Sequence, residues 1–172
     1  VYGTRAGFSV AEISIFVSAI FIGGMIFQYP FGWLSDRMDR RLMILAAAIG
    51  GILAGLLGFA FGSSFEVVLF AAFIMGGMSN PLYALLIAYT NDYLQVEDMA
   101  AASGGLIFIN GLGAIMGPVI TGWMLTTMGP GGFWIYLSFF MAALAAFVGW
   151  RMPQRPSVYS EEAEDYDPVT YA

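Results

Sequence analysis

The sequence contains no cysteine, no histidine and no lysine, and only 10% of its 172 residues are charged. The absence of cysteine excludes disulfides and thiol catalysis, and without cysteine and histidine the usual zinc ligands are missing. Soluble domains carry about 25% charged residues, so this chain has too little charge to cover a water-exposed surface. Because 59% of the residues are hydrophobic and the mean hydropathy is +0.78, the composition predicts a multi-pass membrane protein.

Charge-free runs mark five segments near the roughly 20 residues that a helix needs to cross a bilayer. The longest run, 99–150, is divided at Gly129-Pro130-Gly131-Gly132, because glycine and proline together end a helix. Strand alternation is missing from these runs, which favours helices over a barrel. We therefore predict an all-α membrane protein with five transmembrane helices. The predicted spans are residues 13–33, 42–61, 67–89, 103–127 and 133–150.

Arginines lie almost entirely on one side of the predicted membrane. Residues 34–41, 90–102 and the tail together hold five arginines, whereas the opposite loops hold only Arg5. By the positive-inside rule the arginine-rich side is cytoplasmic. Residues 1–12 are then an external loop, and the C-terminus is cytoplasmic.

Both ends of the chain lead to expectations. An external N-terminus without a signal peptide, followed by an odd number of spans, predicts at least one helix upstream of Val1. Residues 152–172 are rich in proline, serine and acidic residues and poor in aliphatic ones. Such a segment cannot bury enough apolar surface to offset its ordering, so we expect a disordered acidic cytoplasmic tail.

A dense charge cluster separates the first two predicted spans, where five of ten consecutive residues are charged. Its spacing resembles the loop G-x3-D-[RK]-x-G-R-[RK] of the major facilitator superfamily of secondary transporters. The matching residues are Gly32, Asp36, Arg37, Arg40 and Arg41. Asp39 stands where the family usually has glycine, and its carboxylate adds a partner for the arginines. The resemblance implies a conformational latch; the alternative is an ordinary positive-inside loop with a chance pattern.

A glycine pattern in span 103–127 resembles the antiporter motif of the same family, G-x8-G-x3-G-P-x2-G-G. The residues that carry it are Gly104, Gly113, Gly117, Pro118 and Gly122. Thr121 replaces one glycine of the motif. Helix packing through small residues explains the pattern at least as well. The two interpretations are compatible, so the pattern does not distinguish exchange from import.

The whole chain resembles helices eight to twelve of such a transporter, which implies a partial six-helix half-bundle. The stretch from Asn80 to Gly105 resembles a little-characterised bacterial permease branch and implies the bacterial inner (plasma) membrane. The implied partners are the N-terminal half of the same transporter, the lipid bilayer and a small-molecule substrate. We expect no nucleic acid partner.

Polar side chains inside apolar spans require a functional or a packing reason. Asn80 and Tyr83 are three residues apart and share one face of span 67–89, which by resemblance lines the central cavity. With Gln28 and Asn110 they are our substrate-cavity candidates. A hydrogen bond to a neighbouring helix explains Asn80 equally well and Asn110 somewhat better.

Residues near the membrane surface lead to two further expectations. Trp134 and Trp150 lie at opposite ends of the last span and are expected to be interfacial anchors. Glu97 and Asp98 precede span 103–127 on the side of the arginine loop, where an ion-pair network with the arginines is a reasonable interpretation.

Two functions fit these patterns. The first is the C-terminal part of a secondary transporter that moves a small solute by alternating access. The second is a small five-helix membrane protein without transport activity, such as an assembly partner or a sensor. An enzyme is the least expected class, because no span offers a paired carboxylate, a histidine cluster or an activated nucleophile. We expect no cofactor and no metal site.

Overall fold

The computed structural model describes residues 1–154, and all regular structure in that part of the chain is helical. The helices are α1 (Tyr2–Arg5), α2 (Val10–Ser35), α3 (Arg40–Ala60), α4 (Phe65–Asn91), α5 (Val96–Met128), α6 (Gly131–Arg151) and the 3-10 helix η1 (Met152–Gln154). Helices α2 to α6 are each long and apolar enough to cross a membrane. The predicted fold, an all-α membrane protein with five spans, is confirmed. Most of the expected disordered tail, residues 155–172, lies outside the described part.

Helices extend beyond the charge-free runs that predicted them. Helix α5 begins at Val96 rather than at residue 103, with Glu97 and Asp98 in its first turn. Charge bars these residues from hydrocarbon but not from a helix, and carboxylates favour the positive end of the helix dipole. Residues 1–12, expected to be a loop, contain α1 and the first turn of α2. A capping box between Ser9 and Glu12 fixes the start of α2.

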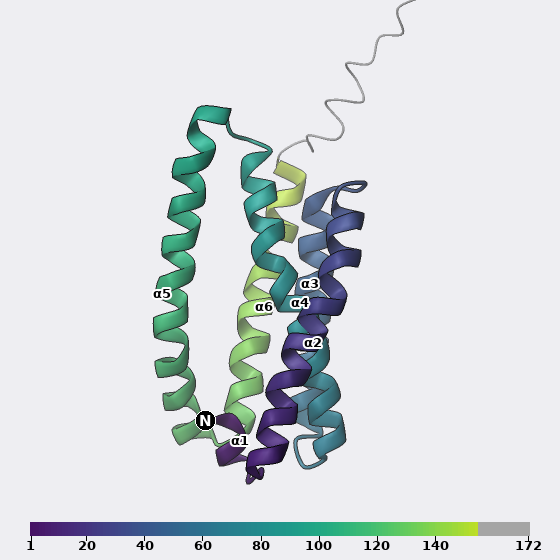
Figure 1. Cartoon of the computed structure of the whole chain (residues 1–172), viewed down its shortest axis with the longest axis vertical. Coiled ribbons are helices and arrows are strands. Elements are labelled where there is room, and N and C mark those ends of the chain that lie inside the picture. The colour runs from purple at the N-terminus through teal and green to yellow at the C-terminus, as the bar shows by residue number, and fades with distance from the viewer. Residues whose placement is uncertain (155–172) are drawn as a thin grey trace, which may run out of the picture.

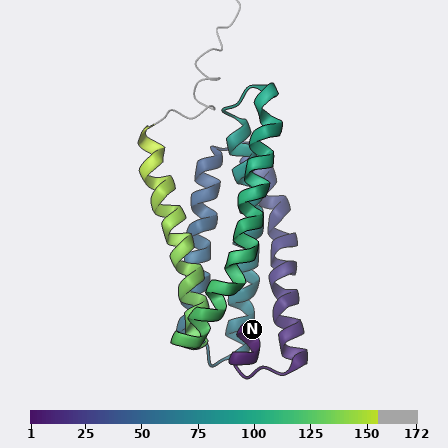
Figure 2. The same cartoon turned by 90° about the vertical axis from the view of Figure 1, so that its left-hand side faces the viewer.

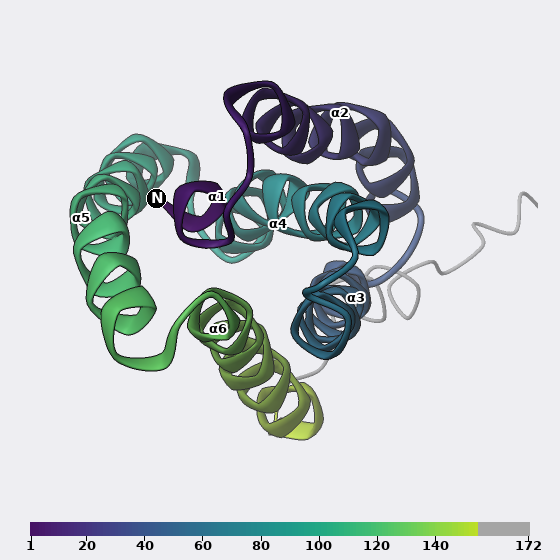
Figure 3. The same cartoon turned by 90° about the horizontal axis from the view of Figure 1, so that it is seen from below.

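The long helices run up and down as a bundle in which four pack together and one stands apart (Figures 1 and 2). Seen from below, α4 lies between α2 and α3, and α6 packs against α3 (Figure 3). Helix α5 is separated from this group along most of its length and meets α6 near the turn that joins them. The described chain is thus a compact four-helix group with a flanking fifth helix.

Helices α2 and α4 cross at backbone contact. A Cβ atom on Gly23 would collide with the carbonyl oxygen of Phe73, and one on Gly76 would collide with the carbonyl oxygen of Ile20. Small residues permit such close approach in membranes, where packing rather than the hydrophobic effect holds helices together. This crossing sets the geometry of the groove described below.

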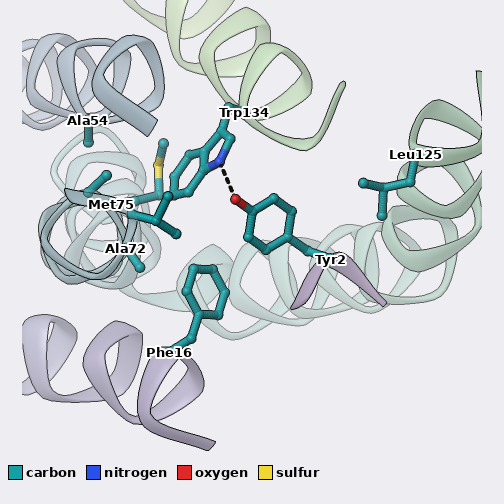
Figure 4. Packing of buried hydrophobic residues seen from close by; sticks show 9 residues of the cluster. Tyr2, Phe16, Ala54, Ala72, Met75, Leu125 and Trp134 are labelled. Carbon is teal, nitrogen blue, oxygen red and sulfur yellow. Dashed lines mark hydrogen bonds between the residues drawn. The ribbon is translucent and has the colours of Figure 1, made fainter. Parts of the chain in front are cut away.

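An aromatic cluster closes the lower end of the bundle in Figure 1 and connects α1 to α2 and α6. The Trp134 indole Nε1 donates a hydrogen bond of 3.0 Å to the hydroxyl oxygen of Tyr2, and Phe16 stacks on the Tyr2 ring (Figure 4). Trp134 is only 1% exposed. Its expected role as an interfacial anchor is therefore wrong: the indole packs between helices, and its N–H is satisfied inside the protein.

Candidate functional site

The loop between α2 and α3 is held at both ends by its own side chains. The Ser35 hydroxyl donates to the Gly32 carbonyl oxygen at 2.8 Å where α2 ends. The Asp39 carboxylate accepts a hydrogen bond of 2.9 Å from the backbone N–H of Arg41 and so caps the start of α3. The charged residues between these points are therefore presented in a short, defined turn.

Asp39 and Arg41 form a bidentate ion pair within this turn. The Arg41 Nε and Nη2 atoms lie 3.0 Å and 2.7 Å from the two carboxylate oxygens of Asp39. Burial raises the pKa of Asp39, but the hydrogen bonds and charge of Arg41 outweigh it and hold that pKa below its ordinary value. Arg41 Nη1 also donates to the Met152 carbonyl oxygen at 3.4 Å, which links the turn to the end of α6. The expected partnership of Asp39 with the arginines is confirmed.

Arg40 connects α3 to the end of α4. Its Nε atom lies 3.1 Å from the Asp92 carboxylate, and its Nη2 atom lies 3.7 Å from the Asp36 carboxylate. The Asp36 side chain remains 68% exposed. The Arg37 guanidinium lies 4.0 Å above the centre of the Trp33 ring, as a cation–π pair. The loop thus offers one accessible carboxylate beside arginines that are already engaged.

Sequence reasoning missed Asp92 and favoured Glu97 and Asp98 as acidic partners. In the described residues the ion pairs of this cluster run to Asp36, Asp39 and Asp92, and Glu97 and Asp98 are exposed at the start of the separated α5. The available signal was position, because Asp92 directly follows the last turn of α4 on the side of the arginines. Arg40 pairs with Asp92 because α3 packs against α4, and the sequence alone does not show that packing.

A groove of about 460 Å³ lies on one flank of the α2–α4 crossing. Its lining residues are Phe21, Gly24, Met25, Gln28, Tyr29 and Asn80. Two of the four substrate-cavity candidates, Gln28 and Asn80, are therefore brought together from segments 52 positions apart. Their role in substrate binding remains a prediction.

Asn80 is positioned by its own helix and by a glycine of the neighbouring one. Its amide Nδ2 donates to the Gly76 carbonyl oxygen at 3.1 Å. A Cβ atom on Gly24 would collide with the Asn80 side chain. The missing side chain of Gly24 therefore makes room for the amide, a contribution that the sequence did not reveal because glycines also occur in these helices for packing alone.

The other two cavity candidates lie elsewhere. Tyr83 is 37% exposed, one turn further along α4, and does not line the groove. Asn110 is exposed on α5, which stands apart from the α2–α4 pair. The structure brings neither residue to the two amides.

The glycine pattern of α5 finds no packing partner within residues 1–154. A Cβ atom at any of its glycines would meet no heavy atom within 4 Å. The glycines concerned are Gly104, Gly113, Gly117 and Gly122. Pro118 lies inside the same continuous helix and is exposed. The prediction that these small residues pack therefore concerns a surface outside the described chain and remains a prediction.

Comparison with known proteins identifies the family. The sequence profile of the Major Facilitator Superfamily matches residues 2–169. An uncharacterised MFS-type transporter of Bacillus subtilis, YfkF, is 35% identical over 130 residues, which cover 74% of this chain and 32% of that protein. The benzoate transport protein of Acinetobacter baylyi is 28% identical over 145 residues, covering 84% of this chain and 30% of the relative.

The chain spans about a third of the length of these relatives. The family profile, by contrast, matches nearly the whole chain, and the five apolar helices agree with that match. On these grounds, the chain belongs to the Major Facilitator Superfamily and is a multi-pass membrane protein.

Proposed function

We propose that the chain is the C-terminal part of a secondary transporter that moves a small solute across the bacterial inner membrane by alternating access. The observation that carries this proposal is the groove between α2 and α4, where Gln28 and Asn80 place two polar groups within otherwise apolar spans. Polar groups at such depth typically mark a substrate path. The family assignment gives no support to a small membrane protein without transport activity, and no enzymatic role is proposed.

The partner required by this mechanism is an N-terminal half, with the groove facing it. Support comes from the glycines of α5, at which an added Cβ atom would meet no neighbour within residues 1–154. Small residues are the usual means by which membrane helices approach one another. Two halves that rock about a central site then expose the groove to each side of the membrane in turn.

The cytoplasmic latch is the second part of the proposal. Asp36 is exposed, and the arginine nearest to it, Arg40, is also held by Asp92. A carboxylate in this position is free to accept hydrogen bonds from the opposite half in one state only. An interaction confined to one state shifts the equilibrium between states, by about tenfold for each 1.4 kcal/mol. Neutralising Asp36 should therefore affect transport more than folding.

Transport is tested in proteoliposomes that contain the protein expressed from its complete gene. One relative is named a benzoate transport protein, so small aromatic solutes, both charged and uncharged, are the first to assay. We expect saturable uptake of at least one of them by the complete protein, none by residues 1–172 alone, and a strong loss with Asp36→Asn at unchanged abundance. Glu97→Gln is the matched control and should transport normally. Equal uptake by residues 1–172 alone would contradict the two-half mechanism.

Orientation is a separate part of the proposal, with the N-terminus outside and the C-terminus cytoplasmic. It is supported by the five arginines on one side of the spans. Fusions of alkaline phosphatase to the loop at 62–66 and of a fluorescent protein to the C-terminus should both be active. Activity of a cytoplasmic reporter fused at 62–66 would show that the chain has the opposite orientation.

A further inference from the structure

The α2–α4 groove combines flat apolar walls with uncharged hydrogen-bonding groups. Phe21, Met25 and Tyr29 supply aromatic and thioether surface along α2, and Gln28 and Asn80 supply carboxamides. The groove has a volume of about 460 Å³ and is open on one side, because Phe21, Met25 and Tyr29 are each at least 67% exposed. Planar apolar walls with a few polar groups are typical of sites for small organic ligands.

Both carboxamides retain hydrogen-bonding capacity. Asn80 uses one N–H for the Gly76 carbonyl oxygen, which leaves a second N–H and its own carbonyl oxygen. The Gln28 side chain makes no hydrogen bond to another residue of the part that the structure describes. Each amide can therefore offer a donor and an acceptor side by side, which suits a ligand with the same uncharged pair of groups.

No charged residue is among those that line this groove. Helix α2 carries no charged residue between Glu12 and Asp36, and α4 carries none between Glu66 and Asp92. Along the helix axes, Gln28 is eight residues from Asp36, or about 12 Å, and Asn80 is twelve residues from Asp92, or about 18 Å, at 1.5 Å per residue. An ion removed from water without an opposite charge nearby is strongly disfavoured. The described lining of the groove therefore contains no charge that would compensate an anion or a cation.

We infer that the groove binds an uncharged, planar ligand that presents an adjacent hydrogen-bond donor and acceptor, such as an aromatic carboxamide. The ring lies against the apolar wall, and the amide meets Gln28 and Asn80. The inference rests on the proposed transport function for the access of solutes to this face. Benzamide is the probe, because benzoate has nearly the same shape and differs chiefly by its negative charge.

The absence of cysteine from the chain permits a direct binding assay. Met25→Cys places a thiol in the groove of the protein expressed from its complete gene, in which any cysteine outside residues 1–172 is replaced by serine, and its alkylation by a water-soluble maleimide is timed in membranes. We expect benzamide at about ten times its Kd to slow this reaction about tenfold, whereas benzoate and benzylammonium at equal concentration leave it nearly unchanged, which requires about a hundredfold preference, or about 2.8 kcal/mol. Ser63→Cys, in the loop between α3 and α4, reports any direct effect of the probes on the reagent.

Substitution of the amide separates specific binding from simple crowding. Asn80→Leu keeps a side chain of similar size without polar atoms and should abolish the protection of Met25→Cys by benzamide. Ser79→Ala is the matched control: its hydroxyl bonds to the Met75 carbonyl oxygen of its own helix, away from the groove. Protection should persist in Ser79→Ala.

Three results would overturn the inference: protection by benzoate equal to that by benzamide, no protection by benzamide at any soluble concentration, or protection unchanged in Asn80→Leu. Its failure is distinguishable from failure of the proposed function. If the same protein takes up some solute saturably but benzamide gives no protection, the proposed transport function is supported and only the inferred ligand class is wrong. Poor folding of Asn80→Leu is recognised by altered alkylation of the Met25 site without ligand, and the comparison of benzamide with benzoate then decides.

Discussion

Helices α4 and α5 are both long apolar helices that contain glycine, yet they are packed very differently. In the most apolar 18-residue window of α4 half of the residues are buried, whereas none is buried in the corresponding window of α5. Gly76 of α4 touches the backbone of α2, while Gly113 of α5 meets nothing. Glycine content therefore marks where a membrane helix can be approached closely, and the partner that approaches must be found from the packing.

The largest expected effect sharpens this comparison between the two helices. Gly76→Leu forces a side chain into the Ile20 backbone, which only separation of α2 and α4 relieves. Overpacking costs about 1–3 kcal/mol, and we expect the upper end here because backbone cannot move aside as a side chain can. Gly113→Leu should stay within about 0.5 kcal/mol of wild type in residues 1–172. The measurement is unfolding in mixed micelles; equal losses for both variants would contradict it.

Tryptophan gives the second comparison. Trp134→Phe removes the buried hydrogen bond to the Tyr2 hydroxyl and should cost about 1–2 kcal/mol, since an unsatisfied hydroxyl remains. Trp123 on α5 is 67% exposed, and Trp123→Phe should be nearly neutral. Tyr2→Phe together with Trp134→Phe should recover part of the loss, because neither polar group is then left unpaired. A double variant as unstable as the sum of both would show that shape, not the hydrogen bond, matters.

The ion pairs of the turn between α2 and α3 give a smaller effect. A double-mutant cycle of Arg40→Gln with Asp92→Asn should report a coupling of about 0.5–1 kcal/mol, because the pair is partly exposed. The same cycle with Asp98→Asn, at the start of α5, should report none. Coupling of Arg40 to Asp98 as large as to Asp92 would mean that α5 approaches the arginine turn more closely than the structure places it.

The smallest effect is a dependence on pH. The pKa of Asp39 is lowered in the folded protein, so its carboxylate stabilises the fold fully above the unfolded value of about 3.9 and loses that contribution as pH falls through the folded value. Unfolding free energy should therefore decline below about pH 4, and Asp39→Asn should flatten this decline. Asp98→Asn is the control for general acid effects. If unfolding free energy declines below pH 4 as steeply in Asp39→Asn as in the wild type, the Asp39–Arg41 pair is not the cause of the decline.

Local patterns predicted the helices because hydrophobicity acts on each segment separately. Charge-free runs located all five spans. They placed the start of α5 too late, because a charge-free run marks the segment that can lie in hydrocarbon, whereas a helix can begin before that segment. The partnership of Asp39 with the arginines was also readable, because the residues are two positions apart.

Contacts between distant residues were out of reach. The Tyr2–Trp134 and Arg40–Asp92 pairs depend on which helices adjoin, and no pattern in either segment encodes that. For the groove, unusual polarity in apolar spans pointed to Gln28 and Asn80, but Tyr83 and Asn110 satisfied the same criterion and lie elsewhere. The sequence shows that these four polar residues lie within apolar spans, but it does not show which side of each helix faces the groove.

The hydrogen bond from Arg41 to the Met152 carbonyl oxygen joins residues 111 positions apart, and so bears on the time course of biosynthesis. At about 5–20 residues per second, the ribosome needs roughly 5–20 seconds to travel from one to the other. During that interval Arg41 has Asp39 beside it but lacks its acceptor at the end of α6. A nascent chain that stalls before α6 emerges therefore presents an incomplete arginine turn, which proteases that survey unfinished membrane proteins can recognise.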